Sequence, residues 1–295
     1  MAPEQLPAWA TWAVLAALAI VAAAAASVGA WLRRPPADRV EGVWGHVTEL
    51  RRRLVRSVMA CAAAVAVVFV VRVGPAPPYI AVDPYDNLAA QVFRRMAADL
   101  KPADVRLIVT APADGFVAMF DVALGLGLFI ALPYVLAQVG GFVWPALRSR
   151  ERRLLGLTLG PATLLFAVGA LFAYRFLLPP AFTALYAFSS ALGADGLLDV
   201  AEFVSFTVML LLLSGAAFLT PLAMLALARI GLATPQGYLR YWRHAVVAIV
   251  VVAAVVTPDP TPVSQLLVAG PLVGLYFLGV ALAVPARRAF DRSQT

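Results

Sequence analysis

Long uncharged apolar stretches alternate along this chain with short segments rich in arginine. Four stretches are long enough to cross a bilayer core of roughly 30 Å, which takes about 20 helical residues. They are Ala8 to Leu32, Val122 to Leu147, Leu154 to Tyr174 and Phe203 to Ala228. A fifth, Ser57 to Val71, is shorter, but the arginines beside it can extend toward the headgroups while the helix gains a turn at each end. We expect all five to span a membrane as helices.

The last apolar region, Ala245 to Ala286, has a proline-rich interruption at Thr257 to Pro262. Proline ends one helix and is tolerated at the start of the next. The interruption therefore predicts a helical hairpin whose first arm, Ala245 to Val256, is too short for a full crossing. Together with the five stretches above, the pattern predicts seven helices.

The only sizeable segment between the expected spans is Val73 to Ala113, which is rich in proline and aspartate. After Asp86, a candidate helix cap, four apolar residues recur at helical spacing. We expect a short amphipathic helix there, lying against the outer face of the bundle as a cap. The four residues are Leu88, Val92, Met96 and Leu100.

The basic residues orient the expected helices. Segments 33–56, 148–153, 229–243 and 287–292 hold 17 of the 23 lysines and arginines, and the alternating segments hold the rest. Because cytoplasmic loops carry an excess of positive charge, the first set is predicted to be cytoplasmic. This prediction places the N-terminus outside and the C-terminus inside a multi-pass protein of the cell membrane.

Composition narrows the function classes. At 62% hydrophobic and 13% charged residues, with a mean hydropathy of +0.87, lipid must be the main solvent. The net charge of +7 sits in short interhelical loops, so it indicates topology and anionic lipid rather than nucleic-acid binding. One cysteine, Cys61, and two histidines, His46 and His244, give no disulfide framework and no zinc site. Without a nucleotide-binding loop, we expect neither cofactor nor metal.

The first apolar stretch needs separate treatment because it precedes its positive charge. A secretory signal peptide has its charge before the apolar run, whereas here Glu4 precedes the run and Arg33-Arg34 follow it. A twin-arginine export signal also places its arginine pair first. We therefore expect residues 1–36 to form an uncleaved anchor with its N-terminus outside, and residues 37–295 to form one membrane domain.

Chemistry concentrates just before the second expected span, in His46 to Leu54. As a helix, this segment puts an apolar face opposite a charged face. Glu49 and Arg53 are spaced to pair at i,i+4, and the other arginines can hold lipid phosphates. From this segment alone we favour an interfacial helix stub. The apolar face comprises Val47, Leu50 and Leu54, and the charged face Glu49, Arg52, Arg53 and Arg56.

The same segment closely resembles the HLxELRxRL signature that opens TatC proteins, and three further motifs follow in that family's order. The first resembles P-xxx-YQVWxFxxPxL-xxx-ERR, the second F-xxPxAF, and the third TPxD-xx-SQ, which is one residue longer here. In combination they cover the chain from about His46 to Pro285. The matching residues are Pro133, Gln138-Val139, Phe142, Pro145 to Leu147 and Glu151 to Arg153; then Phe176, Pro179 and Ala181-Phe182; then Thr257-Pro258-Asp259 and Ser264-Gln265.

Three features depart from the family pattern. Ala137 and Gly140 stand where the family often has Tyr and Trp. The stretch Ala8 to Leu32 has no counterpart in the usual six-helix members. In the fifth expected helix of this chain, Phe203 to Ala228, Leu219 takes the place of an intramembrane glutamate in the family's F-E-x-P motif.

The resemblance implies an all-α polytopic bundle, with a TatC-like six-helix core and one additional N-terminal transmembrane helix. It implies a non-enzymatic role as the core subunit of a twin-arginine translocase, which recognises signal peptides and exports folded proteins with the proton-motive force. The implied partners are twin-arginine signal peptides, TatA/TatB-type single-span proteins, membrane lipids and further copies in a larger complex. The matching sites are Glu49, Glu151, His46, Arg51 and Phe142 for the signal peptide; Gln138, Leu219 and Thr220 for a partner helix; and Pro258, Asp259 and Gln265 in the hairpin.

Several alternatives stay open at this point. Glu151 can form an ordinary loop ion pair with Arg148 or Arg152, and such exposed pairs are weak. Gln138 and Thr220 can make hydrogen bonds within one subunit. A secondary transporter or channel is the alternative function, although the helix interiors carry no charge. An intramembrane hydrolase would need a nucleophile with a base, which scattered Ser and Thr do not provide.

Overall fold

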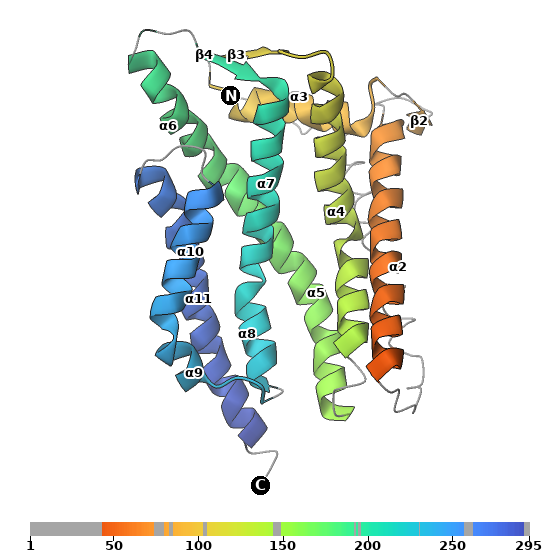
Figure 1. Ribbon diagram of the computed structural model, residues 1–295, viewed down its shortest axis with the longest axis vertical. Helices are drawn as coiled ribbons and strands as arrows, with labels where there is room; N and C mark the ends of the chain where they lie inside the picture. Colours follow the sequence, from red (N-terminus) through yellow and green to blue (C-terminus); the bar gives the residue numbers. More distant parts are fainter. Residues whose placement is uncertain are drawn as a thin grey trace, which may run out of the picture. The chain divides into compact units, whose positions relative to one another are not determined.

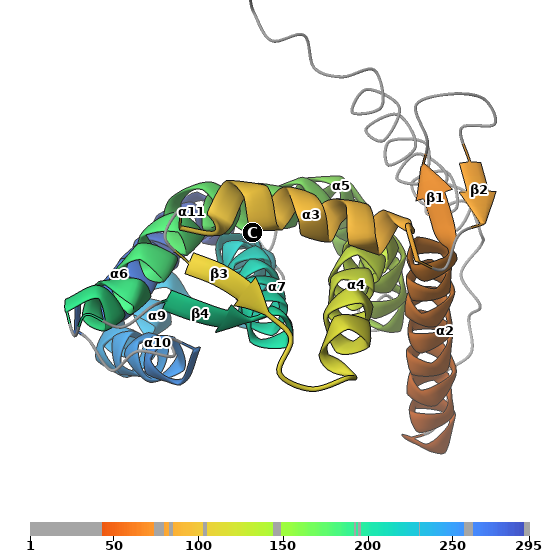
Figure 2. The ribbon, with the colours of Figure 1, turned by 90° about the horizontal axis from the view of Figure 1, so that it is seen from above.

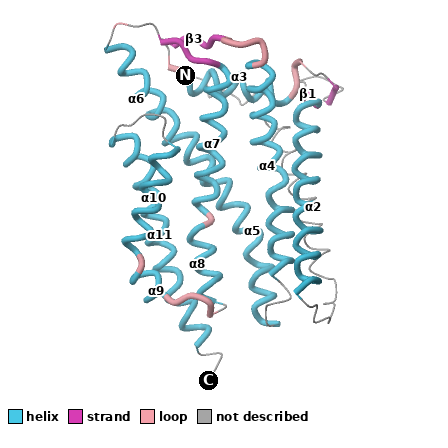
Figure 3. The backbone as a smooth tube through the Cα atoms, in the orientation of Figure 1, coloured by secondary structure: helices cyan, strands magenta, loops and turns pink. Residues whose placement is uncertain are grey.

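The computed structural model describes residues 43–73, 80–82, 85–102, 105–143, 149–191, 193, 196–229, 231–256 and 262–291. Helices dominate these residues, as the sequence predicts, and strands are few and short (Figure 1, Figure 3). The chain divides into two compact units, residues 1–99 with 109–146 and residues 100–108 with 147–295. The expected first span, Ala8 to Leu32, lies outside the described residues.

The first unit is built on two long antiparallel helices, α2 (Val43–Val70) and α4 (Asp114–Val143) (Figure 1, Figure 2). Two three-residue strands follow α2 and pair antiparallel, β1 (Val71–Val73) and β2 (Ile80–Val82). Helix α3 (Leu88–Leu100) covers the expected amphipathic positions. The sequence prediction of a short helix in this segment is therefore confirmed.

Close backbone approach holds α2 against α4. A Cβ atom added to Gly127 would lie 2.6 Å from Val65 Cγ2 and 2.8 Å from Val65 N. Val68 and Ala123 are almost fully buried, and the Phe69 and Phe116 rings meet edge to face with centroids 5.6 Å apart. A glycine at 127 thus allows the two helices to pack more closely than a side chain would permit.

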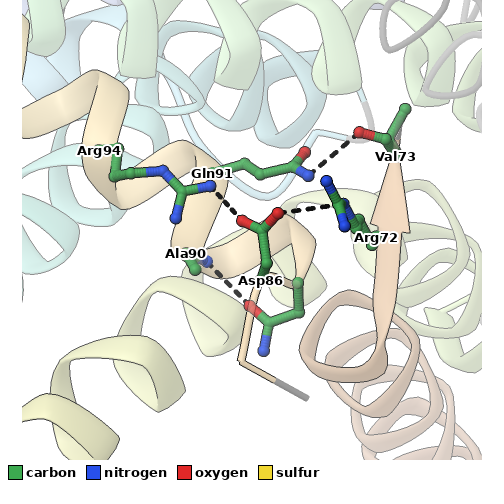
Figure 4. A network of polar contacts seen from close by, with 7 residues as sticks. Arg72, Val73, Asp86, Ala90, Gln91 and Arg94 are labelled. Carbon is green, nitrogen blue, oxygen red and sulfur yellow. Dashed lines mark hydrogen bonds and ion pairs between the residues drawn. The ribbon is translucent and has the colours of Figure 1, made fainter. Parts of the chain in front are cut away.

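Polar contacts tie α3 to the end of α2 (Figure 4). Asn87 is fully buried, its Nδ2 donating to Phe69 O at 2.6 Å and its Oδ1 accepting from Ala90 N at 2.9 Å. Gln91 Nε2 donates to Val73 O at 3.1 Å. The cap of α3 is therefore Asn87 and not the expected Asp86. Asp86 instead pairs with Arg72 at 3.0 Å and with Arg94.

The second unit begins with a helical segment longer than the expected span. Helix α5 (Ser149–Phe172) passes through a π-helical turn, η2 (Ala173–Leu177), into α6 (Leu178–Ala191). Pro179 has no N–H, and its ring would clash with the carbonyl of Arg175 in a regular α-helix. The wider π turn before Pro179 removes this clash, so the helix continues past the proline. The apolar helical segment therefore runs to Tyr186 rather than ending at Tyr174.

The expected span from Phe203 to Ala228 is broken near one end. Helix α7 (Val200–Phe218) ends at Leu219, and α8 (Thr220–Arg229) begins at the next residue (Figure 3). Pro221 lacks the N–H that would continue the α7 ladder, so the break follows from the Leu219-Thr220-Pro221 sequence. Before α7, β4 (Gly196–Asp199) pairs in parallel with β3 (Val105–Ile108).

Three helices complete the second unit: α9 (Pro235–Arg240), α10 (Trp242–Val256) and α11 (Pro262–Asp291). Tyr276 Oη donates to Tyr238 O at 2.8 Å, which fixes α11 to α9. Tyr238 Oη in turn donates to Met224 O of α8. Burial and the neighbouring Tyr276 raise the pKa of Tyr238, so its hydroxyl remains a donor at neutral pH.

Five helical segments among the described residues are long and apolar enough to cross a membrane. Helix α10 is apolar but shorter, in agreement with the short first arm of the hairpin. The count of seven is a prediction that the described residues leave untested, since Ala8 to Leu32 lies outside them. The five segments are Val47–Val70, Asp114–Phe142, Gly160–Tyr186, Val200–Arg229 and Gln265–Pro285.

Candidate functional site

The carboxylate of Glu49 is bound by an arginine one helical turn away. Helix α2 begins at Val43, before the charged run, so residues 49 and 53 lie one helical turn apart on the same side of its surface. Arg53 donates to Glu49 Oε1 from Nε at 2.8 Å and from Nη2 at 2.5 Å. The two side chains are only 22% and 18% exposed. The pairing predicted from the spacing is confirmed.

The geometry leaves Glu49 with acceptor capacity. Both N–H groups of Arg53 end on the same oxygen, Oε1, and no described side chain donates to Oε2. Arg51, Arg52 and Arg56 are exposed on the same helix. This surplus of guanidinium groups makes the local potential positive, which disfavours unselective cation binding. A second guanidinium can bind here only with geometry good enough to compete.

The opposite side of this segment is apolar and open. Val47, Leu50 and Leu54 are 52%, 46% and 61% exposed, and helical spacing places them together. Exposed aliphatic side chains beside arginines suit a position where the hydrocarbon core meets the headgroups. The segment therefore has the two-faced character that its sequence predicts.

Two other expected site residues belong to the same end of the α2–α4 pair. Because α2 and α4 are antiparallel and Val65 lies beside Gly127, equal rise per residue puts Glu49 level with the last residues of α4. Phe142 and Gln138 lie in the last turns of that helix, and both are half-buried. The fold thus brings Glu49, Phe142 and Gln138 to one end of the first unit.

The remaining expected signal-peptide residues are less fully placed. Glu151 belongs to the first turn of α5, in the second unit, and its side chain is not among those described. The same is true of the side chain of His46, which belongs to α2. Arg51 is exposed on α2.

The expected partner-helix residues of the second unit lie at the break between α7 and α8. Leu219 and Thr220 are both half-buried. The Leu219 N–H donates to Ala216 O at 3.1 Å, and its carbonyl accepts from Ala223 N at 2.9 Å, so the backbone is satisfied across the break.

The sequence did not predict a small apolar pocket that is lined in part by Phe218, the residue before Leu219. Helices α5, α7 and α11 line it together with η2, and its one hydroxyl, on Ser214, already donates to Gly169 O at 2.9 Å. Its walls are therefore suited to hydrocarbon. No local pattern in the sequence predicts it, because its lining comes from segments far apart in the chain. Lining residues include Phe172, Leu210, Phe218, Val268, Pro271 and Leu272.

In the hairpin, Gln265 connects the two arms. Its Nε2 donates to Val250 O at 3.1 Å, from α11 to α10. Pro258 and Asp259 lie outside the described residues. Among the residues described, no group of three or more His, Cys, Asp or Glu could hold a metal ion.

Comparison with known proteins gives consistent matches over most of the chain. The family model described as Sec-independent protein translocase protein (TatC) matches residues 45–271. A Sec-independent protein translocase protein TatC from Cenarchaeum symbiosum is 35% identical over 244 residues, 81% of this chain and 92% of that protein. One from Deinococcus radiodurans is 32% identical over 256 residues, 84% of this chain and 88% of its own length.

A solved structure agrees with these matches. The crystal structure of a twin-arginine translocase receptor, TatC, is similar with a TM-score of 0.69 and 31% sequence identity. The similarity covers 82% of this chain and 99% of that one.

Proposed function

The chain belongs to the TatC family of Sec-independent protein translocase proteins, and from this premise we propose that Glu49 and Glu151 bind the arginine pair of a twin-arginine signal peptide. As a family member the chain is a multi-pass membrane protein and the core subunit of a twin-arginine translocase. Because the family consists of protein translocase subunits, the proposed role of these residues is to bind the transported protein's signal peptide.

The Glu49–Arg53 pair is the observation that carries this proposal. A guanidinium binds a carboxylate best in a shielded place where two parallel hydrogen bonds can form. Glu49 is four-fifths covered and already accepts from one guanidinium, and none of the described side chains donates to its Oε2. A site that holds arginine internally has the geometry to hold an arginine from outside.

The internal pair is also easy to displace. Arg53 lies on the same helix as Glu49, so their contact holds no second element in place. An incoming guanidinium that replaces Arg53 keeps the largely covered carboxylate paired, so the exchange leaves no buried charge uncompensated. A signal peptide can therefore take over the carboxylate without breaking the fold, while Arg53 turns outward. Glu151 supplies the second carboxylate by its match to the family motif.

A single-span TatA/TatB-type partner is proposed to dock at the α7–α8 break. Leu219 leaves no carboxylate there, and the adjacent pocket is apolar, so docking relies on packing and on neutral hydrogen bonds worth about 1 kcal/mol or less. Leu219→Glu should impair assembly because it leaves an unpaired carboxylate, which costs about 2.5 to 3.5 kcal/mol at membrane depth. Thr220→Val should cost little. A partner whose polar residue crosslinks directly to position 219 would show this account to be wrong.

Orientation and energy source complete the proposal. The distribution of arginine supports a cytoplasmic end for the α2 site and the C-terminus, with residues 73–113 outside, and with the proton-motive force driving export. Single cysteines placed in residues 73–113 should react with impermeant reagent from outside, and one near Ser149 only from inside. The reverse labelling pattern would contradict the orientation.

Binding of signal peptides tests the recognition site. Purified chain in detergent should capture a twin-arginine signal peptide and release it to a soluble competitor, while the twin-lysine version of that peptide is captured weakly. Lysine keeps the charge but loses the bidentate fork. Equal capture of the two peptides would contradict the assignment, because charge alone would then explain binding.

A further inference from the structure

Helix α2 is the least covered of the five candidate spans. In its most apolar stretch only 11% of residues are buried, against 28% to 33% in the other four. One side packs on α4 through Val65 and Val68, and Val68 is 1% exposed. Met59 lies nine residues before Val68, which is two and a half turns at 100° per residue, so the two residues lie on opposite sides of the helix. Met59 is 64% exposed. The side of α2 directly opposite α4 is therefore open.

This open face has helical spacing and a small-residue centre. It comprises Val55, Met59, Ala62 and Ala66, at intervals of four, three and four residues, and all four are exposed. Ala62 and Ala66 are one turn apart. Two alanines in that arrangement allow another helix to approach the backbone closely. A face covered by lipid alone has no requirement for them.

We propose that residues Ala8 to Leu32 form a helix that packs antiparallel along this open face of α2, so that the additional N-terminal span is a fixed part of the first unit. The proposal does not depend on the signal-peptide site. It commits to a segment of this same chain as the occupant of the face.

Chain length supports this occupant. Only ten residues, 33–42, separate Leu32 from the start of α2 at Val43. Fully extended they reach at most about 36 Å, and packed helix axes lie 8–10 Å apart. Helices that follow one another along a chain with so short a connection are usually neighbours. Since α4 occupies one side of α2, the open face is the side left for the preceding helix.

Composition supports the same occupant. Alanine makes up 12 of the 25 residues from Ala8 to Leu32, and Ala22, Ala26 and Ala30 recur at intervals of four. Small residues on both helices permit close packing in lipid, where no hydrophobic effect drives helices together. A helix with alanines along one side can therefore approach Ala62 and Ala66 more closely than a helix with large side chains there.

Depth in the membrane predicts the register. Arg33 ends the first span and Arg53 lies at the corresponding end of α2. If these arginines are level, antiparallel helices place Ala62 beside about residue 24 and Ala66 beside about residue 20. In this register the alanines at 22–26 lie beside Ala62, and Ala66 lies beside Ile20.

Disulfide crosslinking tests the contact. Cys61→Ala removes the chain's only cysteine, and Ala62→Cys is then combined in turn with cysteine at residues 22, 23, 24 and 25, which together cover every side of the first helix. Ala66→Cys with residues 18–21 allows for a shift in register. Copper-phenanthroline oxidation in membranes should give a disulfide within one chain for at least one combination. Ala64→Cys, at the same depth on the side nearer α4, is the matched control and should give at least tenfold less.

Each outcome decides the proposal. A disulfide within one chain at position 62 or 66, and not at 64, supports it. No disulfide from any combination, or equal yield at positions 62 and 64, overturns it. Coexpression of two differently tagged copies separates the remaining case: a disulfide that joins two copies would show that a second chain covers the face, and would overturn the proposal as well.

Discussion

Each end of α2 has a carboxylate bonded to arginine, yet the two pairs connect different things. At one end, Glu49 bonds Arg53 of the same helix. At the other, Asp86 joins Arg72 of β1 to Arg94 of α3, and beside it Gln91 bonds the Val73 carbonyl of β1 (Figure 4). Asn87 bonds the Phe69 carbonyl at the end of α2.

The difference separates a contact that holds structure from one that is free to exchange. At the Asp86 end, the buried Asn87 amide, Gln91 and the ion pairs together connect α2, β1 and α3, so loss of this whole cluster would loosen three elements at once. Loss of the Glu49–Arg53 pair would leave α2 intact, because the pair lies within one helix. An arginine–carboxylate pair within one helix can exchange its arginine without loosening the fold. When the pair is also partly buried and one carboxylate oxygen accepts no hydrogen bond from it, the carboxylate is a candidate to bind a ligand's arginine.

The largest expected effect comes from charge reversal at the exchangeable end. Glu49→Lys should weaken twin-arginine peptide binding by about 30-fold or more, since losing a buried charge partner costs about 2–5 kcal/mol. Glu151→Lys should act similarly. Asp86→Lys is the matched reversal at the other end of α2, and the inserted protein should still bind peptide. Fluorescence anisotropy on monodisperse protein measures all three, and normal binding by both glutamate variants would show that the site is wrong.

A packing change on α4 should have the next largest effect, on stability instead of recognition. Gly127→Leu puts side-chain atoms into the space of the Val65 backbone, and overpacking of this kind costs about 3 kcal/mol at the upper end. We expect a clear fall in the thermal unfolding midpoint in detergent. Gly115→Leu is the control on the same helix, because its Cβ position is open. Equal midpoints for the two variants would contradict the close approach of α2 and α4.

Loss of the α3 cap should have a smaller effect. Asn87→Ala removes a cap and leaves the Phe69 carbonyl without its donor, which costs about 1–2 kcal/mol. Asn87→Asp keeps the cap but not the donor, so it should recover part of the loss. Amide hydrogen exchange in α3 should increase in Asn87→Ala. Unchanged exchange there would mean that Asn87 does not anchor the helix.

The smallest effect is expected at the exposed ion pairs of Asp86. Arg72 and Arg94 are 43% and 59% exposed, and pairs at that exposure contribute at most about 1 kcal/mol. Asp86→Asn should therefore lower the unfolding midpoint only slightly. A loss as large as that of Asn87→Ala would show that the charges, and not the buried amide, hold this corner.

Local patterns in the sequence predicted the features that depend on neighbours along one helix. Apolar runs predicted the long apolar helices among the described residues, helical spacing predicted α3, and the i,i+4 interval predicted the Glu49–Arg53 bond. The cap of α3 was misplaced by one residue because Asp and Asn are both good caps, and only the fold brings the Phe69 carbonyl to Asn87.

Features that depend on distant segments could not be predicted in this way. The β3–β4 pairing joins residues about 90 positions apart, and no local pattern announces it. The π turn before Pro179 and the break at Leu219 were not predicted, because a proline without its N–H does not by itself specify how the helix responds: Pro133 and Pro271 lie inside α4 and α11. The apolar pocket arises where three helices meet around η2, so its lining is scattered through the sequence.

The most direct test of the central claim is whether Glu49 itself distinguishes arginine from lysine. Dissociation constants of the twin-arginine and twin-lysine peptides are measured for the unmodified chain and for Glu49→Gln, which forms a double-mutant cycle. The account predicts that the unmodified chain prefers arginine by about tenfold or more and that Glu49→Gln loses most of this preference. An equal preference in both proteins would contradict direct contact between Glu49 and the arginine pair.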